Sequence, residues 1–219
     1  MIEVRRSGSR AVTRTDWLDS RHSFSYGSHY DPDNTHFGLL LACNEDRLTP
    51  GAGFDPHPHR DVEVVTWVVA GSLRHADSVG GRGEARPGTV QRMSAGAGVR
   101  HAEHAGPEGA HYVQMWLRPA VFGEEPAYDT VAVGPGLVTV SPLRQPAATL
   151  HAGQLRGSTV LPAAAYRHLL VLAGTVAVAG EELGPGDAAR LTGGGPVELR
   201  SPAGAELVAW EMRAGLSVG

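Results

Sequence analysis

The sequence predicts an all-β protein built from two stacked antiparallel β-barrels. The chain has 219 residues, a length that suits one large β domain or two small ones and can bury a sizeable core. It contains 29 glycines and 15 prolines with few runs suited to helices, which favours short strands joined by turns. An internal repeat of roughly a hundred residues indicates two copies of one β unit.

The repeat consists of three short segments that recur in the same order. Val171–Thr175 resembles Val68–Ser72, Pro185–Asp187 resembles Pro87–Thr89, and Leu207–Trp210 resembles Val113–Trp116. Valine-rich strands that end at a glycine are common, so any one match could arise by coincidence. Three matches in one order favour duplication, and with it two barrels of the same design.

Six strands are predicted in the first half, and one of them, Val62–Val69, is an apolar run rich in β-branched residues. The six strands are Ile2–Arg5, Phe37–Cys43, Val62–Val69, Thr89–Met93, Val99–Glu103 and Tyr112–Leu117. Residues 119–160 carry five prolines, which is typical of a crossover rather than of a core element. We therefore expect an N-terminal barrel over residues 1–120, a crossover or linker over 121–160, and a C-terminal barrel over 161–219.

Composition excludes several classes of function. The net charge is −4, so there is no basic surface for nucleic acid or anionic lipid. All 19 basic residues are Arg, which excludes lysine Schiff-base chemistry, and the single Cys43 excludes an internal disulfide framework or thiolate metal cage. Neither a signal peptide nor an apolar run near 18 residues is found, so we expect a soluble cytoplasmic protein with no membrane partner.

Two pairs of metal-competent side chains dominate the first half. They are His57 with His59, and His101 with Glu103, each pair separated by one residue. On a strand, residues i and i+2 point to the same face about 7 Å apart, so two such pairs on facing strands would converge on one point. Three imidazoles and a carboxylate suit divalent iron, manganese, nickel, copper or zinc better than calcium or magnesium. We therefore predict one metal per chain.

The second half lacks these ligands. Counting from Gly71 and Gly174 sets His57 and His59 opposite Val160 and Pro162. Counting from the Pro-Gly pairs sets His101 and Glu103 opposite Leu199 and Ser201. None of these four side chains suits a transition metal. The C-terminal barrel is therefore predicted to be metal-free, with a structural role.

These motifs resemble a known family. Gly51, His57, His59 and Glu63 fit the G-x5-H-x-H-x3-E pattern of the first cupin motif, and PGTVQRMSAGAGVRHAE resembles the second. Together with WLDSRHSFSYG upstream, HPHRDVE and HADS make the chain similar to the pirin family, in particular to bacterial pirin-like quercetin 2,3-dioxygenases. The resemblance covers most of residues 1–120 and implies a bicupin of jelly-roll type, with metal in the N-terminal barrel alone.

The family resemblance leaves two acids to compare. In many cupins the glutamate at the position of Glu63 binds the metal, whereas in pirins it is the glutamate at the position of Glu103. Along an extended strand Glu63 would lie about 13 Å from His59, whereas Glu103 follows His101 on the same face. We therefore expect Glu103 to be the ligand, and Glu63 to hydrogen-bond to one of the metal's ligands or to act as an acid on the substrate side.

Other polar residues have simpler interpretations. His104 points away from the His101 face by parity and is expected at the surface or in a loop. His75 and Asp77 match a pirin feature, but a turn-forming pair is the simpler interpretation. Cys43 lies on an apolar strand and is expected to pack as a small hydrophobe.

The resemblance implies a dioxygenase that holds Fe(II), with Mn, Ni, Cu or Zn as alternatives. Its substrates would be dioxygen and a flavonol such as quercetin, cleaved at the 2,3 bond, with Glu103 as both ligand and catalytic base. Pirins also act as metal- or redox-dependent regulators through protein partners, which is the alternative function. A cupin isomerase or another dioxygenase would use the same ligands, and a purely structural ion is the simplest alternative of all.

Overall fold

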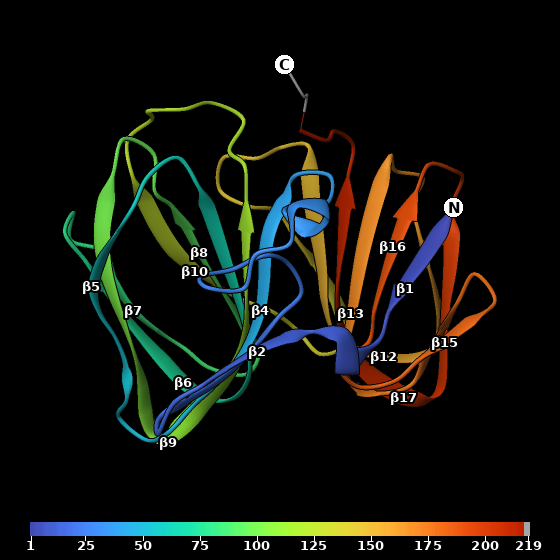
Figure 1. Ribbon diagram of the computed structural model, residues 1–219, viewed down its shortest axis with the longest axis horizontal. Helices are drawn as coiled ribbons and strands as arrows, with labels where there is room; N and C mark the ends of the chain where they lie inside the picture. Colours follow the sequence, from blue (N-terminus) through green and yellow to red (C-terminus); the bar gives the residue numbers. More distant parts are fainter. Residues whose placement is uncertain (217–219) are drawn as a thin grey trace.

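The computed structural model describes residues 1–216 and contains two antiparallel β-sheets, each curled into a barrel (Figure 1). The N-terminal sheet comprises nine strands: β2 (Ala11–Arg14), β3 (Leu18–His22), β4 (Leu40–Leu48), β5 (Gly53–His59), β6 (Glu63–Asp77), β7 (Arg82–Ala85), β8 (Thr89–Ser94), β9 (Val99–Leu117) and β10 (Ala127–Ala132). Seven of them follow the hydrogen-bonded order β10-β8-β6-β9-β4-β3-β2, while β5 pairs with β9 and β7 pairs with β6.

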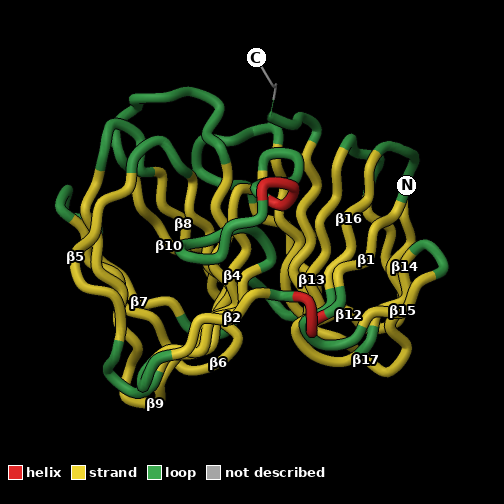
Figure 2. Tube along the Cα trace, in the orientation of Figure 1, coloured by secondary structure: helices red, strands yellow, loops and turns green. Residues whose placement is uncertain are grey.

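The C-terminal sheet has eight strands: β1 (Ile2–Arg5), β11 (Leu137–Val140), β12 (Ala148–Leu161), β13 (Tyr166–Gly174), β14 (Val176–Val178), β15 (Glu181–Leu183), β16 (Ala188–Thr192) and β17 (Val197–Met212). Its order is β1-β16-β13-β17-β12-β11, with β14 joining β15 to β17. Figure 2 shows that helix is confined to two short 3-10 turns, η1 (Ser7–Ser9) and η2 (Pro32–Asn34). Within residues 1–216 no helix is long and apolar enough to cross a membrane. The predicted all-β, two-barrel fold is confirmed.

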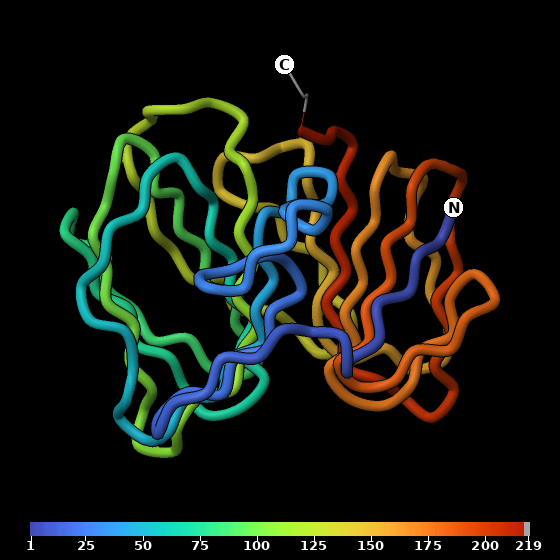
Figure 3. Tube along the Cα trace, in the orientation of Figure 1, coloured from blue at the N-terminus to red at the C-terminus, as the bar shows by residue number. Residues whose placement is uncertain are grey.

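The division of the chain between the barrels differs from the predicted boundaries. Strand β1 pairs with β16 and so belongs to the C-terminal sheet, as the blue segment beside the orange strands shows (Figure 3). Residues 121–160 are not a simple linker, because β10 adds to the N-terminal sheet while β11 and β12 begin the C-terminal one. The prolines that suggested a crossover lie between these strands, where no ladder hydrogen bond is required of them.

The duplication predicted from the sequence is visible in the bends of the long strands. Gly71 and Gly174 both have positive φ angles, 70° and 72°, at equivalent points of the two barrels. A Cβ atom at Gly71 would collide with the carbonyl of Gly109, and one at Gly174 with that of Gly204. Only glycine tolerates this combination of left-handed backbone and close approach, which explains why both copies carry it.

The two barrels pack through one apolar cluster to which both sheets contribute. Met115 enters it from the N-terminal sheet, Phe24 from the segment that follows β3, and Leu170 and Trp210 from the C-terminal sheet. The Trp210 indole donates a hydrogen bond across the interface to Met115 Sδ at 3.1 Å. On β13 the neighbouring Leu169 instead packs in the interior of its own barrel. Successive side chains of this strand therefore alternate between the contact with the other barrel and the interior of their own.

Candidate metal centre

Strand pairing, rather than convergence across the barrel, brings the predicted histidines together. Strand β5 lies antiparallel beside β9, with His57 opposite His101 and His59 opposite Val99. The imidazole centroids of His57 and His101 are 4.5 Å apart, and those of His59 and His101 are 4.8 Å apart. The three rings therefore meet at one point inside the N-terminal barrel.

The ring nitrogens of these histidines fit a bound metal ion. His57 Nδ1 lies 2.8 Å from the carbonyl of Asp55, which leaves its Nε2 free. The buried Nε2 atoms of His59 and His101 have no hydrogen-bond partner among the described residues. One ligand atom from each of the three histidines lies within 4.8 Å of the others. Buried polar atoms are almost always paired, and ring nitrogens that converge without donors fit a site that can hold a metal cation.

A hydrogen-bonded chain fixes the orientation of His101. Its Nδ1 lies 3.3 Å from His75 Nδ1, and His75 Nε2 lies 3.0 Å from Asp77 Oδ2. If the carboxylate of Asp77 accepts the proton on His75 Nε2, then His75 Nδ1 accepts from His101 Nδ1–H. That tautomer places the lone pair of His101 on Nε2, the atom that faces the other two rings.

Burial keeps two of the imidazoles neutral. It lowers the pKa of His59 to about 4, and charge on the neighbouring His101 and His57 would lower it in the same direction. Burial likewise lowers the pKa of His101 to about 3, again with a contribution from neighbouring imidazoles. At neutral pH both rings therefore present lone pairs, the form that binds metal.

Glu103 is held in place by two glutamines. It is 2 % exposed, and its Oε1 and Oε2 accept hydrogen bonds from Gln91 Nε2 at 2.6 Å and Gln114 Nε2 at 2.7 Å. Each amide carbonyl accepts in turn, Gln91 from the Tyr128 hydroxyl at 3.2 Å and Gln114 from the Trp116 indole at 3.1 Å. These outer contacts fix both amide groups with their NH₂ ends toward the carboxylate.

Among residues 1–216, possible ligand atoms gather in two overlapping groups. The first contains His57, His59 and His101, and the second contains His75, His101 and Glu103. Both nitrogens of His75 already have neighbours, Asp77 and His101. The first group is therefore the better candidate for a metal site. Glu103 lies next to it, because His101 belongs to both groups.

Glu63 lies apart from these side chains. The sequence pattern places it on one strand with His59, but a turn separates β5 from β6, and Asp61 within it has φ = 51°. Glu63 Oε2 accepts a hydrogen bond from the backbone amide of Arg144 at 2.9 Å. Burial raises the pKa of its carboxyl group. Among the described residues it belongs to neither group of possible ligands.

The equivalent positions of the second barrel need a one-residue correction. Val160 is 58 % exposed and Pro162 is also exposed, so neither corresponds to an interior histidine. In the second barrel, pairing of β12 with β17 sets Thr159 opposite Leu199 and Leu161 opposite Val197. In the first barrel, His57 and His59 of β5 lie opposite His101 and Val99 of β9. If Leu199 matches His101, Thr159 and Leu161 therefore match His57 and His59. The different loop lengths explain the shift.

The remaining sequence interpretations have mixed outcomes. Cys43 is fully buried in the interbarrel cluster, as predicted, and His104 is partly exposed near Asp55. Asp77 does form a turn, accepting from the amides of Val79 and Gly81, but it also orients His75. Sequence analysis missed the glutamines that hold Glu103. The available signal for Gln114 was a glutamine within the otherwise apolar strand Tyr112–Leu117, whereas Gln91 lies beside Arg92 in Thr89–Met93 and gave none.

The chain is similar in sequence to proteins of one family. The family model for pirin matches residues 4–117. A Mycobacterium bovis protein named "Putative quercetin 2,3-dioxygenase" is 47% identical over 98% of this chain and 96% of its own length. A "Pirin-like protein" of Caulobacter vibrioides is 35% identical over 88% of this chain and 91% of its own.

Solved structures extend the similarity to the whole fold. The crystal structure of a bacterial pirin from Escherichia coli in complex with nickel(II) superimposes with a TM-score of 0.91. The two sequences are 28% identical, and the match covers 99% of this chain and 100% of the other. Family model, full-length relatives and fold therefore agree, and the chain belongs to the pirin family.

Proposed function

We propose that the N-terminal barrel binds one divalent transition metal through His57, His59, His101 and Glu103, and that the protein is a dioxygenase acting on a flavonol. The observation that carries the proposal is the pair of buried Nε2 atoms, on His59 and His101, that face one another without hydrogen-bond partners. The nickel(II) complex of the E. coli pirin and the relatives named as quercetin 2,3-dioxygenases support the same chemistry.

The donor set suits a catalytic ion better than a structural one. Structural zinc sites usually have four ligands and are rich in cysteine, whereas here three imidazoles and one carboxylate come from a chain with a single, distant cysteine. A metal held by these four side chains would keep coordination positions for a substrate or dioxygen. When bound, a divalent metal such as Fe(II) would act as a Lewis acid that lowers the pKa of a coordinated hydroxyl.

Glu103 is the residue in this barrel best placed to take a proton from the substrate. Each of its oxygens accepts one amide hydrogen bond and retains a second lone pair. One lone pair can serve as ligand while another receives the proton of the flavonol 3-hydroxyl. Gln91 and Gln114 would keep the carboxylate in position as its protonation changes, which is the role of a supporting partner in general base catalysis.

The overall reaction consumes one dioxygen for each flavonol. Both oxygen atoms enter the product as the heterocyclic ring opens, and one ring carbon leaves as carbon monoxide, so no external reductant is required. The test is oxygen uptake and carbon monoxide release by the Fe(II)-loaded protein with quercetin, repeated with Mn, Ni, Cu and Zn. Turnover that depends on the metal is the expected result.

Two variants separate the ligand and base roles from nonspecific effects. In Glu103→Gln the new NH₂ group would meet the NH₂ of Gln91 or Gln114, so metal content is measured together with turnover. Loss of turnover with the metal retained supports the base role, while unchanged turnover contradicts it. His104→Ala, on the same strand but partly exposed, is the control and should keep both metal and activity. If the fully loaded wild-type protein consumes no oxygen with any flavonol, the enzymatic proposal fails and the regulatory alternative replaces it.

A further inference from the structure

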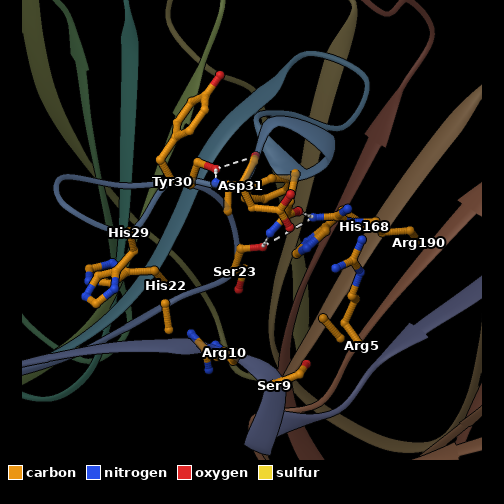
Figure 4. A pocket seen from close by; sticks show the side chains of 15 residues that line it. Arg5, Ser9, Arg10, His22, Ser23, His29, Tyr30, Asp31, His168 and Arg190 are labelled. Carbon is orange, nitrogen blue, oxygen red and sulfur yellow. Dashed lines mark hydrogen bonds between the residues drawn. The ribbon is translucent and has the colours of Figure 1, made fainter.

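A second polar site lies between the two barrels, away from the metal centre. It is a pocket of about 280 Å³ with walls from both sheets and from the segment that follows β3. Figure 4 shows Arg5 and Arg10 on one side, and Arg190 and His168 of the C-terminal sheet reaching toward Ser23. Its volume is at the lower limit of small-molecule sites, which suits a small ion or metabolite.

Arginines are concentrated in the wall of this pocket. Three of them line it, together with one carboxylate, that of the exposed Asp31. Arg10 forms an ion pair with Glu45 at 2.8 Å, and Arg5 forms one with Glu3 at 2.6 Å. Arg190 is 5 % exposed, and within residues 1–216 no carboxylate lies at ion-pair distance from it. Its guanidinium instead contacts oxygens of Ser23 and Asn34, which carry no net charge.

His168 is the strongest sign of a missing ligand. It lies on β13 directly opposite Arg190 of β16, on the strand face that points to the other barrel. Its side chain lines the pocket and is 1 % exposed. Neither Nδ1 nor Nε2 has a hydrogen-bond partner in the described part of the chain. The ring packs beside Phe24, with centroids 5.5 Å apart, so an apolar residue would fill the same space.

Further donors in the pocket wall are also unsatisfied. Among them, Nε of Arg10 and Nε of Arg190 are buried without partners, although both terminal nitrogens of Arg10 and Nη2 of Arg190 donate hydrogen bonds. A buried N–H without an acceptor is rare in folded proteins. The unsatisfied groups come from both barrels, and the arginines among them can only donate. The pocket therefore offers donors to a hydrogen-bond acceptor, and the charge of Arg190, which no carboxylate pairs among the described residues, favours a negative one.

The proton equilibria of these groups are consistent with an absent anion. Burial lowers the pKa of His168 to about 3, and the positive charges of Arg190 and Arg10 act in the same direction. Burial also lowers the pKa of Arg190 to about 10, with repulsion from Arg5 adding to the effect. A bound anion would relieve both effects, because it offsets the positive charge and accepts hydrogen bonds from the desolvated donors.

We propose that this interbarrel pocket binds a small oxyanion, the carboxylate or phosphate group of a ligand, through His168, Arg190 and Arg10. Charge-assisted hydrogen bonds from guanidinium groups to carboxylate and phosphate oxygens are short and strong, and the planar guanidinium matches their geometry. Because Arg10 precedes the N-terminal barrel and His168 and Arg190 belong to the C-terminal one, the bound anion would connect the two barrels.

The test measures binding of two probes, inorganic phosphate and acetate, to the metal-loaded protein by calorimetry, with chloride at matched ionic strength as reference. We expect saturable binding of at least one probe and a rise in melting temperature that follows its saturation. Binding of phosphate alone assigns the ligand to phosphate compounds, and binding of acetate alone assigns it to carboxylates. If neither probe binds up to tens of millimolar, the proposal is wrong.

His168→Leu is the decisive variant. It removes both unpartnered nitrogens and keeps the contact with Phe24, so the variant should fold and retain its metal. Its affinity for the probe should fall by about tenfold or more. Arg190→Met should lose binding as well, which provides a second measurement if one variant is poorly folded. Arg156→Gln, an exposed arginine on β12, is the control and should bind like the wild type. Unchanged affinity in His168→Leu and Arg190→Met would show that the anion binds elsewhere, for instance at the metal, and would refute the proposal.

Discussion

The two barrels share one architecture but differ in what fills them. The C-terminal barrel has a continuous apolar interior that includes Leu169, Val171 and Leu199. At the corresponding place the N-terminal barrel buries His101 and Glu103, and its apolar residues form two separate clusters on either side. The difference shows that the fold tolerates either interior, and that reactive chemistry in one copy requires only a few inward-facing substitutions together with partners that hold them.

The polar interior of the N-terminal barrel destabilises the fold in a way that the apolar interior of the C-terminal barrel does not. A buried polar group without a partner destabilises a protein by about 1–3 kcal/mol. His59 and His101 each carry such a nitrogen, whereas the interior of the C-terminal barrel is closed by methyl and methylene groups. The apolar barrel can therefore supply stability to the chain while the polar one retains an unsatisfied site for a ligand.

Removal of a metal ligand should produce the largest difference between the barrels. In His101→Ala the imidazole at the centre of the cluster is lost, and we expect metal affinity to fall by more than the roughly 10–100-fold typical of residues that only support a ligand. Metal content by elemental analysis and competition with a chelator measure the loss. Wild-type affinity in this variant would exclude the proposed ligand set.

The same position in the other barrel should affect stability instead. Leu199→Ala leaves a cavity among tightly packed side chains, with an expected decrease of about 2–5 kcal/mol in the free energy of unfolding. Urea denaturation of the metal-free protein measures it. Metal affinity should stay at the wild-type value, and a parallel loss of metal would mean that the barrels do not divide the two roles.

A smaller effect is expected for the glutamines that hold Glu103. Gln114→Leu removes the 2.7 Å hydrogen bond to Oε2 and frees the Trp116 indole, so metal affinity should fall by about 10–100-fold. Gln154→Leu is the matched control, since Gln154 donates to Glu206 at 2.9 Å on the exposed surface of the C-terminal barrel. Equal effects of the two substitutions would argue against a supporting role for Gln114.

The last effect concerns pH. In the folded, metal-free protein the pKa of His101 is lowered from 6.5 to about 3, so the ring stays neutral where the unfolded chain takes up a proton. Between pH 6.5 and about 3 the unfolded state binds more protons, and the free energy of unfolding therefore decreases as the pH falls. His101→Leu should weaken this dependence, whereas Leu199→Ala should not. Parallel pH profiles of all three proteins, measured by urea denaturation, would contradict the assignment.

Much of the site follows from alternation along strands, and the rest depends on contacts between distant strands. The pairs His57 with His59 and His101 with Glu103 could be found because residues i and i+2 of a strand point to the same face. Gln91 has no such signal, since a single glutamine becomes informative only when pairing sets its strand beside others. The turn at Asp61, which separates Glu63 from the histidines, depends on a left-handed residue that is not glycine.

The fold was predictable to a similar extent. The repeated segments that end at a glycine predicted two barrels. A bend that only glycine permits requires glycine at the same place in both copies, so the repeat is visible in the sequence. Strands β10 and β11 were missed, as they are short, lie among prolines and gain their stability from pairing at sheet edges. Sequence alternation cannot show which sheet a short strand will join.

The pairing of β1 with β16 has a consequence for how the protein forms. Residues 2–5 are synthesised long before residues 188–192, the segment on which they dock. During translation β1 has no partner strand until the whole N-terminal barrel has been synthesised. The C-terminal sheet therefore gains this edge strand only near the end of synthesis. A cut between the barrels would therefore not yield two intact halves, since one fragment would carry the other's edge strand.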